Sequence, residues 1–242
     1  MEIDIATDYE TLSKKAAGDL ISLIGTRDNP LVCVASGDSP AGLYRELVNK
    51  VRQREVDVRA WNFLGLDEWV GLNGADEGSC RFHLDNQFFK LLEISPDKIL
   101  FVDGRTENAI QQCEQVERFI QQKGGIDVAI VGLGMNGHIG MNEPGTPVSR
   151  RTHISRLHPL TVQVGQKYFQ KAQPLSEGIT LGLGTLMDAK YVLLLVNGSK
   201  KASIVKQVLE GPMTEDIPGS LFRNHPGFKV YLDKEAASLL SD

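Results

Sequence analysis

Apolar and polar positions recur along this chain with two different periods, and the alternation between them predicts its secondary structure. Residues 9–24 place apolar side chains at the spacing of one helical face: Leu12, Ala16, Leu20 and Leu23. Residues 31–35 form a short, uninterrupted apolar run, which is typical of a strand buried on both faces. Ser39 and Pro40 are then a predicted N-cap and first helical residue, opening a helix to about Arg52.

The rest of the chain continues this alternation of strands and helices. Further strands are predicted at residues 62–66, 98–102, 127–132, 178–182, 191–196 and 228–232. Further helices are predicted at residues 82–92, 107–122, 162–169 and 200–209, with a short one at the C-terminus. The inner face of the helix at 107–122 is expected to consist of Ile110, Val116 and Ile120.

This order predicts an α/β fold: a single-domain, doubly wound, mainly parallel sheet with helices on both faces, in a modified Rossmann-like arrangement. Because no Ser-, Gly- or Pro-rich linker divides the chain, residues 1–242 are expected to form one domain. Residues 144–160 are the longest stretch that we expect to be irregular. Loops of that length are usually lids or binding loops.

Composition narrows the classes of partner and location. The chain of 242 residues is 41% hydrophobic, enough for a sizeable core. Its net charge is −5 and it has no run of Lys or Arg, so nucleic acid and anionic membranes are poor candidate partners. The longest apolar run, residues 191–196, is too short to span a bilayer. The lack of a signal peptide and of metal spacing among Cys33, Cys80 and Cys113 predicts a reduced, cytoplasmic protein.

The most informative segment is the apolar strand at 127–132 and the glycine-rich loop that follows it. Within eight positions the loop carries an amide, an imidazole and a carboxylate: Asn136, His138 and Glu143. Its glycines also match G-x-G-x-x-G, but Pro144 and Pro147 forbid the helix that a dinucleotide site needs. A histidine near a carboxylate favours proton transfer. A metal site is a weaker alternative, because no second His or Cys lies nearby.

Three other predicted strands or helices also begin or end in chemically informative residues. Asp67 and Glu68 follow an apolar strand, where only one of them can point into a given pocket. Burial against Leu and Trp would raise the pKa of such a carboxylate towards that of a general base, although helix capping is the commoner role. Residues 36–40 precede a helix and suit an anion. Lys200 and Lys201 lie in the first turn of another predicted helix, where their positive charges oppose the helix dipole. This placement indicates either that they are solvated surface residues or that an anion binds there.

These four segments, in this order, resemble the glucosamine-6-phosphate deaminase (isomerase) family. The family's L-D-E-Y/W-V-G-L motif occurs at residues 66–72, and its glycine-rich G-x-G-x-N/D-G-H-I-x-x-N-E-P-G motif at residues 132–145. Its small-residue phosphate loop corresponds to residues 36–40, and its later G-x-x-K-A motif to residues 198–202. The resemblance covers nearly the whole chain, and the two central motifs are specific.

The resemblance implies a reaction in which an amino-sugar 6-phosphate is opened to its aldehyde, isomerised and deaminated to a ketohexose 6-phosphate and ammonia. Asp67 would be the base that moves a proton from C2 to C1. His138 would open the ring, with Asn136 and Glu143 orienting or assisting it. The phosphate would bind a group of residues at two helix starts and a third segment: Ser36, Gly37, Asp38, Ser39, Lys167 and Lys201. Neither a metal nor an organic cofactor is implied, and we expect a monomer or a small homo-oligomer.

Some positions depart from the commoner family pattern. Asn136 stands where Asp is frequent, and Lys167 where Arg is frequent. Larger hexameric relatives bind an allosteric phosphosugar with basic residues at positions that His153 and Ser155 occupy here, so we expect no allosteric control. Trp69 and residues 78–80 resemble the galactosamine-6-phosphate branch. A 6-phosphogluconolactonase-like hydrolase and a non-catalytic phosphosugar sensor are the alternatives; the sensor would need a DNA-binding segment for which no residues are left over.

Overall fold

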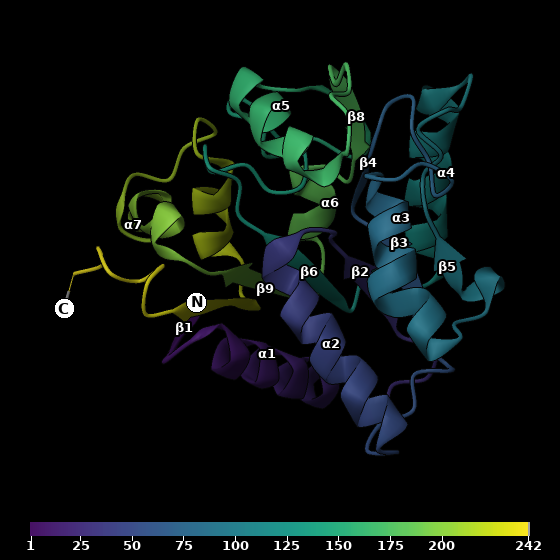
Figure 1. Cartoon of the computed structure of the whole chain (residues 1–242), viewed down its shortest axis with the longest axis horizontal. Coiled ribbons are helices and arrows are strands. Elements are labelled where there is room, and N and C mark those ends of the chain that lie inside the picture. The colour runs from purple at the N-terminus through teal and green to yellow at the C-terminus, as the bar shows by residue number, and fades with distance from the viewer. Residues whose placement is uncertain (242) are drawn as a thin grey trace.

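Seven parallel strands form the central sheet. The computed structural model describes residues 1–241, and it orders the strands β1-β10-β9-β6-β2-β3-β5 (Figure 1). The strands are β1 (Glu2–Ala6), β2 (Leu31–Val34), β3 (Asn62–Gly65), β5 (Ile99–Leu100), β6 (Val128–Gly132), β9 (Tyr191–Val196) and β10 (Phe228–Asp233). From β2 the chain moves outward to β3 and β5, and then returns to place β6 on the other side of β2. The order therefore reverses between β2 and β6, where open α/β sheets place their ligands.

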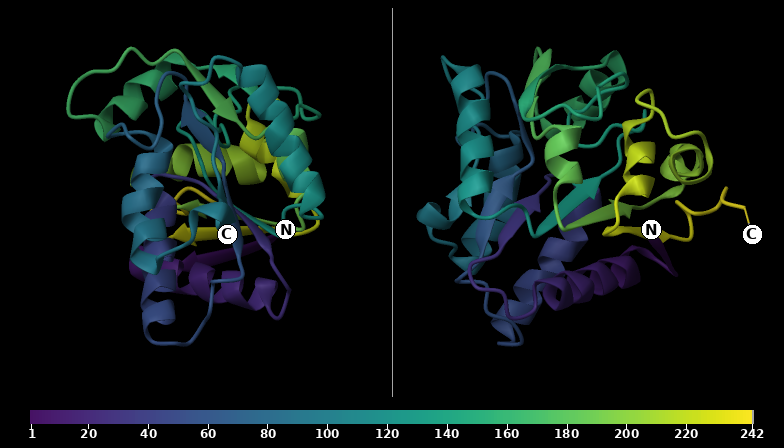
Figure 2. Two further views of the ribbon diagram at one scale, coloured as in Figure 1. Left: turned by 90° about the vertical axis from the view of Figure 1, so that its right-hand side faces the viewer. Right: turned by 180° about the vertical axis from the view of Figure 1, so that it is seen from behind.

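Helices cover both faces of this sheet (Figure 2). One layer contains α1 (Tyr9–Ile24), α2 (Asp38–Arg52) and α3 (Cys80–Leu84), the last continuing as a π-helical turn at Asp85–Phe89. The other layer contains α4 (Ala109–Gln122), α6 (Leu183–Met187) and α7 (Ala202–Glu210). Successive residues of β2 pack into opposite layers: Val32 into the first and Cys33 into the second. Burial on both faces explains the uninterrupted apolar runs of the strands.

A second, antiparallel sheet stands on the carboxyl edge of the first. It has the order β4-β8-β7, with β4 at Asp67–Trp69, β7 at His153–Arg156 and β8 at Glu177–Thr180. The chain leaves β3 at Gly65 and enters β4 two residues later, while the Leu66 N–H still donates to the Val34 carbonyl. Asp67 therefore lies at the junction of the two sheets. The short helix α5 (Pro159–Gly165) lies in the connection between β7 and β8.

The predicted fold class is confirmed: the main sheet is parallel and is covered on both faces. The strand predicted at 178–182 is β8, but it pairs antiparallel in the small sheet. The expectation that residues 144–160 are irregular is wrong at β7. The mostly polar sequence of this strand gives no strand pattern, and the strand is stabilised by its antiparallel pairing with β8. Strands β1 and β4 and helix α6 were not predicted. β4 has only three residues, two of them acidic, which local strand propensity does not favour.

Three local predictions are wrong. The C-terminal segment at 234–240 forms turns rather than a helix. Ile110 does not belong to the inner face of α4. It is the second residue of the helix, and its side chain is 68% exposed. Ser39 does not cap α2: the helix starts two residues earlier than predicted, at Asp38, and the N-cap is Gly37 with φ 117°. That conformation favours glycine because it has no Cβ.

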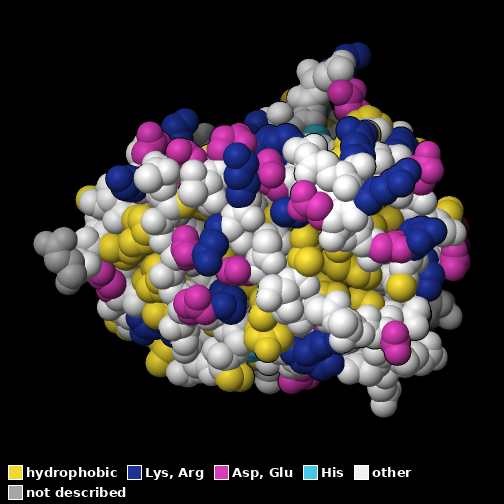
Figure 3. Space-filling view, turned by 90° about the horizontal axis from the view of Figure 1, so that it is seen from below, with side chains coloured by type: hydrophobic (Ala, Val, Ile, Leu, Met, Phe, Trp, Pro, Cys, Tyr) yellow, Lys and Arg dark blue, Asp and Glu magenta, His cyan; other side chains and the backbone are white. Residues whose placement is uncertain are grey.

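The charged surface around α1 and α2 is mixed in sign. Figure 3 shows this face of the molecule, where acidic and basic side chains alternate with apolar ones. Some of the charges are paired, as in Arg45 with Glu10 and Lys15 with Asp19. In the part of the chain that the structure describes, no helix is both long enough and apolar enough to cross a membrane.

Candidate functional site

The loop after β6 folds tightly around the ring of His138. The Gly134 N–H donates to the His138 carbonyl at 2.9 Å, and the Gly137 N–H donates to the Gly134 carbonyl at 3.1 Å. Gly137 has φ 85°, a conformation that L side chains rarely adopt. A Cβ on Gly134 would lie only 2.3 Å from the imidazole. The glycine spacing of the loop thus serves close packing against a histidine, and no helix starts there as a dinucleotide site requires.

His138 faces a carboxylate through its Nδ1 atom. Nδ1 lies 3.4 Å from Glu143 Oε2 and 3.2 Å from the Thr161 hydroxyl, which comes from α5. The Asn136 amide donates to the same Glu143 oxygen at 2.8 Å. Burial opposes ionisation of Glu143, but the interactions with His138, Thr161 and Asn136 lower its pKa to about 2. Glu143 is therefore an anion, and its contact with Nδ1 orients the imidazole.

Asp67 is buried close to this histidine. Its exposed fraction is 8%, and burial raises its pKa to about 6, against opposing effects of Cys80 and of the His138 charge. The neighbouring Glu68 is fully buried and accepts three backbone N–H bonds, from Trp69, Cys80 and Arg81, at 2.9 to 3.0 Å. Glu68 thus caps the start of α3, and Asp67 is the carboxylate near His138. Of the two roles considered for this pair, helix capping is found at Glu68, and the general-base role of Asp67 stays a prediction.

The third group lies where β2 leads into α2. Ser36 and Gly37 follow the strand, and Asp38 and Ser39 form the first turn of the helix. The Ser39 hydroxyl donates to the Asn197 amide oxygen, after β9, at 2.7 Å. A Cβ on Gly37 would lie 3.3 Å from the Tyr168 hydroxyl, so the segment containing Tyr168 closes over this turn.

Two lysines complete this group. Lys201 lies in the single turn Ser199–Lys201 before α7, and its ammonium donates to the Leu133 carbonyl. Burial and the charge of Lys167 lower the pKa of Lys201 to about 8. Lys167 lies in the single turn after α5 and forms an ion pair with Asp38, with 2.6 Å between Nζ and Oδ2. Its ammonium also lies 4.8 Å from the centre of the Tyr168 ring.

The sheet order brings the predicted residues together. β9, β6, β2 and β3 are neighbours in that order, and their carboxyl ends lead to the four segments singled out in the sequence. Only Lys167 comes from outside this set. Thr161, Cys80 and Tyr168 also contribute to the site and were not predicted, because each belongs to a segment without a chemical motif. In the described residues, Glu143 Oε1 is a buried acceptor with no hydrogen-bond partner.

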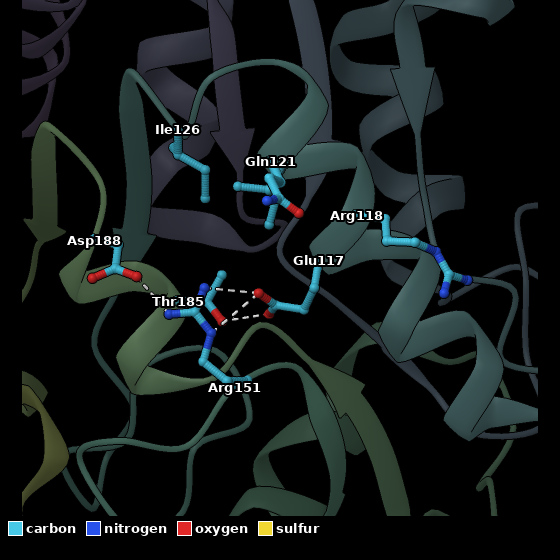
Figure 4. Close-up of a pocket in the computed structure, with 9 residues that line it drawn as sticks. Glu117, Arg118, Gln121, Ile126, Arg151, Thr185 and Asp188 are labelled. Atoms are coloured by element: carbon cyan, nitrogen blue, oxygen red, sulfur yellow. Dashed lines mark hydrogen bonds and ion pairs between the residues drawn. The ribbon is translucent and has the colours of Figure 1, made fainter.

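A separate pocket of about 370 Å³ lies between α4 and the segment that leads to β7 (Figure 4). Arg151 reaches across it to Glu117 and to Asp188. Glu117 also accepts bonds from the Thr152 N–H and hydroxyl and from the Thr185 hydroxyl. The charged groups of Arg151, Glu117 and Asp188 already pair with one another or with nearby donors. These contacts connect α4 to the segment before β7, and we call them the joint. None of the residues predicted for the functional site lines this pocket.

The fold and the site together define a class of protein. It is an α/β protein in which candidate proton-transfer groups and a helix start suited to an anion meet at the switch point of the sheet. The family model described as glucosamine-6-phosphate isomerases/6-phosphogluconolactonase matches residues 7–231. The chain belongs to this family.

Known relatives of similar length support this assignment. A glucosamine-6-phosphate deaminase of Thermoanaerobacter pseudethanolicus is 33% identical over 243 residues, covering 100% of this chain and 96% of the relative. That of Bacillus velezensis is 34% identical over 238 residues, covering 98% and 99%. A solved monomeric glucosamine-6-phosphate deaminase superposes with a TM-score of 0.95 at 32% identity, covering 99% of this chain and 100% of the other. The 6-phosphogluconolactonase of Trypanosoma brucei shares the fold at 19% identity, with a TM-score of 0.80 and coverage of 99% and 98%.

Proposed function

We propose that this protein is an amino-sugar-6-phosphate deaminase and isomerase. It converts glucosamine 6-phosphate, or its epimer galactosamine 6-phosphate, together with water into a ketohexose 6-phosphate and ammonia. The observation that carries the proposal is the meeting of a buried carboxylate and a histidine at one sheet edge. Asp67 has a pKa raised to about 6 by burial, and the nearby His138 is held against the anion of Glu143. Two such groups can divide acid and base work between them.

His138 is the group that opens the pyranose ring in this proposal. With Nδ1 directed at Glu143 and Thr161, the other ring nitrogen is left for the sugar. It can move a proton between the ring oxygen and the C1 hydroxyl, which yields the open aldehyde. Asn136 and Glu143 keep the imidazole oriented, and the unpartnered Glu143 Oε1 is an acceptor for a substrate hydroxyl.

Asp67 then catalyses the isomerisation. Its carboxylate takes the C2 proton of the aldehyde and returns it to C1. The C1 oxygen gains a proton and the C2 amine loses one, so the amino aldose becomes an imine at C2 with a hydroxyl at C1. Water adds to the imine carbon and ammonia leaves, so the atoms balance. The steps are ring opening, proton transfer, addition of water and loss of ammonia, and none changes the overall oxidation state, so the proposal requires no metal or organic cofactor.

The phosphate is proposed to lie at the start of α2. The free N–H groups of the first turn and the helix dipole favour an anion there. The ligands are the serines, glycine and backbone of that turn and the two lysines: Ser36, Gly37, Asp38, Ser39, Lys167 and Lys201. We further propose that residues 1–242 act as one cytoplasmic domain, as a monomer or small homo-oligomer.

The direct test is an ammonia-release assay with glucosamine 6-phosphate and galactosamine 6-phosphate, alongside hydrolysis of 6-phosphogluconolactone. Release of ammonia from one epimer is expected and identifies it. Lys201→Met should raise KM strongly for that sugar, because a half-buried cation at the proposed phosphate site is lost. Absence of ammonia from both sugars, or faster lactone hydrolysis, would overturn the proposal.

A further inference from the structure

A carboxylate stands inside the proposed phosphate site. Asp38 is the first residue of α2, and its side chain already holds Lys167 at 2.6 Å. Both partners are solvent-accessible, with side-chain exposures of 69% for Asp38 and 47% for Lys167. An ion pair this exposed contributes little to stability, so its value to the fold does not explain its position.

The surrounding charges explain it better. Lys167 and Lys201 lie close enough for each charge to disfavour the other, and Asp38 offsets that repulsion. The Tyr168 ring lies on another side of the Lys167 ammonium. Without a bound anion, Asp38 is the carboxylate that pairs with Lys167 and stabilises Lys201.

We propose that Asp38 is a built-in counter-ion, which holds Lys167 in the free protein and yields it to the phosphate of the substrate. This inference rests on the proposed function, because it takes the start of α2 as the phosphate site. A phosphate dianion carries more charge and more acceptor oxygens than a carboxylate, so it displaces the weak pair. The displaced carboxylate remains near the bound dianion and repels it. Asp38 therefore keeps Lys167 in place at the cost of weaker phosphate binding.

The exchange involves the segment that also contacts the candidate catalytic histidine. Lys167 follows directly after α5, and α5 carries Thr161, which contacts His138 at 3.2 Å. Transfer of Lys167 from Asp38 to the phosphate thus occurs on the same short stretch of chain that lies against the imidazole.

The test is calorimetric titration of the full chain with inorganic phosphate, which needs no turnover. Asp38→Asn should bind phosphate about 5- to 30-fold more tightly, because one ion pair no longer competes and one repulsion is lost. Asp38→Ser serves as a second variant. In a Lys167→Met background the gain should be clearly smaller, because the part due to the competing ion pair is absent and only the part due to lost repulsion remains.

The matched control is Glu77→Gln. Glu77 is an exposed carboxylate that accepts a bond from Gln170, in the same stretch as Lys167, but it pairs with neither lysine. It removes the same charge and should leave phosphate affinity nearly unchanged. A second readout is proton uptake on phosphate binding at pH 8, close to the lowered pKa of Lys201. Uptake should increase in Asp38→Asn, because the group that favours the Lys201 charge is gone.

The outcomes separate the two proposals. If the unaltered protein binds phosphate and Asp38→Asn binds it equally or more weakly, Asp38 is not a competitor and the counter-ion inference is wrong. An equal gain in Glu77→Gln would show that only overall charge matters, and would overturn it as well. If the unaltered protein binds neither phosphate nor an amino-sugar phosphate, the phosphate site itself fails, and this inference with it.

Discussion

At the scale of single residues, burial and neighbouring charge give the site carboxylates different properties. Glu143 is surrounded by groups that interact with its charge, so it stays ionised. Asp67 is buried away from solvent and has few groups that stabilise its charge, so its pKa rises to about 6. A base works best when its pKa lies near the working pH, because it is then both deprotonated and strong enough to take a proton.

Asp67→Asn is expected to lower kcat by about 10²- to 10⁴-fold, because the amide keeps the shape but has no basic lone pair. In the unaltered protein, kcat/KM should fall as the pH drops through about 6, since protonation removes the base. Turnover across pH 4.5 to 8 and exchange of the C2 proton with solvent measure both effects. Near-normal exchange in the variant would exclude Asp67 as the base.

His138→Gln is expected to affect ring opening selectively. Turnover of the cyclic sugar should fall far more than turnover of a substrate locked in the open form, because the amide cannot carry a proton. Steady-state rates with both substrates measure the difference. Equal losses with both would place the role of His138 elsewhere in the reaction.

At the scale of elements, loops and helix ends fix the site geometry. The glycine-rich loop after β6 packs on the His138 ring at Gly134, whereas a Cβ on Gly132 would meet nothing within 4 Å. Gly134→Ala should therefore displace the imidazole and lower kcat by roughly 10²-fold, the usual effect of misplacing a catalytic group by about 1 Å.

The control for this prediction is Gly132→Ala, two residues earlier in the chain. It should keep nearly full turnover, and both variants should melt within a few degrees of the unaltered protein. If both variants lose activity equally, general disturbance of the loop explains the effect, and close packing at Gly134 does not.

The joint between α4 and the segment before β7 is a second element-scale feature. Glu117→Ala should lower the free energy of unfolding by about 1–3 kcal/mol, because the buried Thr185 hydroxyl and the half-buried Thr152 N–H and hydroxyl lose a charged acceptor. Burial raises its pKa, but the bonds from Thr152, Thr185 and Arg151 lower it more, so it lies below the usual 4.5. Its stabilising contribution is thus full above pH 4.5 and is lost as the pH falls through the lowered pKa.

Glu114→Ala is the matched control for urea unfolding, since Glu114 lies on the same helix and makes only an exposed contact of 3.6 Å to Arg118. It should cost less than about 1 kcal/mol. Similar losses of unfolding free energy for the two variants would show that the contacts of Glu117 at the joint do not stabilise the fold more than an exposed ion pair does.

At the scale of the whole molecule, the charges that a second phosphosugar would need are missing or in use. Burial lowers the pKa of His153, and its Nδ1 lies 2.9 Å from the Arg151 carbonyl. Ser155 is buried and uncharged. Arg151 is engaged by Glu117 and Asp188.

Rate against substrate is therefore expected to be hyperbolic, with or without an N-acetylated amino-sugar phosphate. Allosteric activation requires a second site that binds two states of the molecule differently. Initial rates over a wide range of substrate concentration, at several concentrations of the acetylated sugar, provide the measurement. A sigmoidal curve that this compound makes hyperbolic would mean that Arg150 or Arg156 supplies the charge.

The sequence by itself determined the repeating parts of the architecture and the order of the chemical segments. Strands such as β6 and β9 are apolar on both faces, and helices such as α1 carry apolar residues at a fixed spacing, so each can be recognised from local periodicity. Parallel strands align their carboxyl ends, so the meeting of Asp67 and His138 at one edge could also be inferred.

Tertiary structure alone decided which partner each side chain finds. That Asp67 approaches His138 while Glu68 caps α3, that Ser39 bonds Asn197, and that β4 and β7 pair with β8 depends on segments far apart in the chain. The ion pair of Asp38 with Lys167 joins residues 129 positions apart. Such contacts leave no periodic signal, because their energy arises from packing and charge between elements and not from the local order of residues.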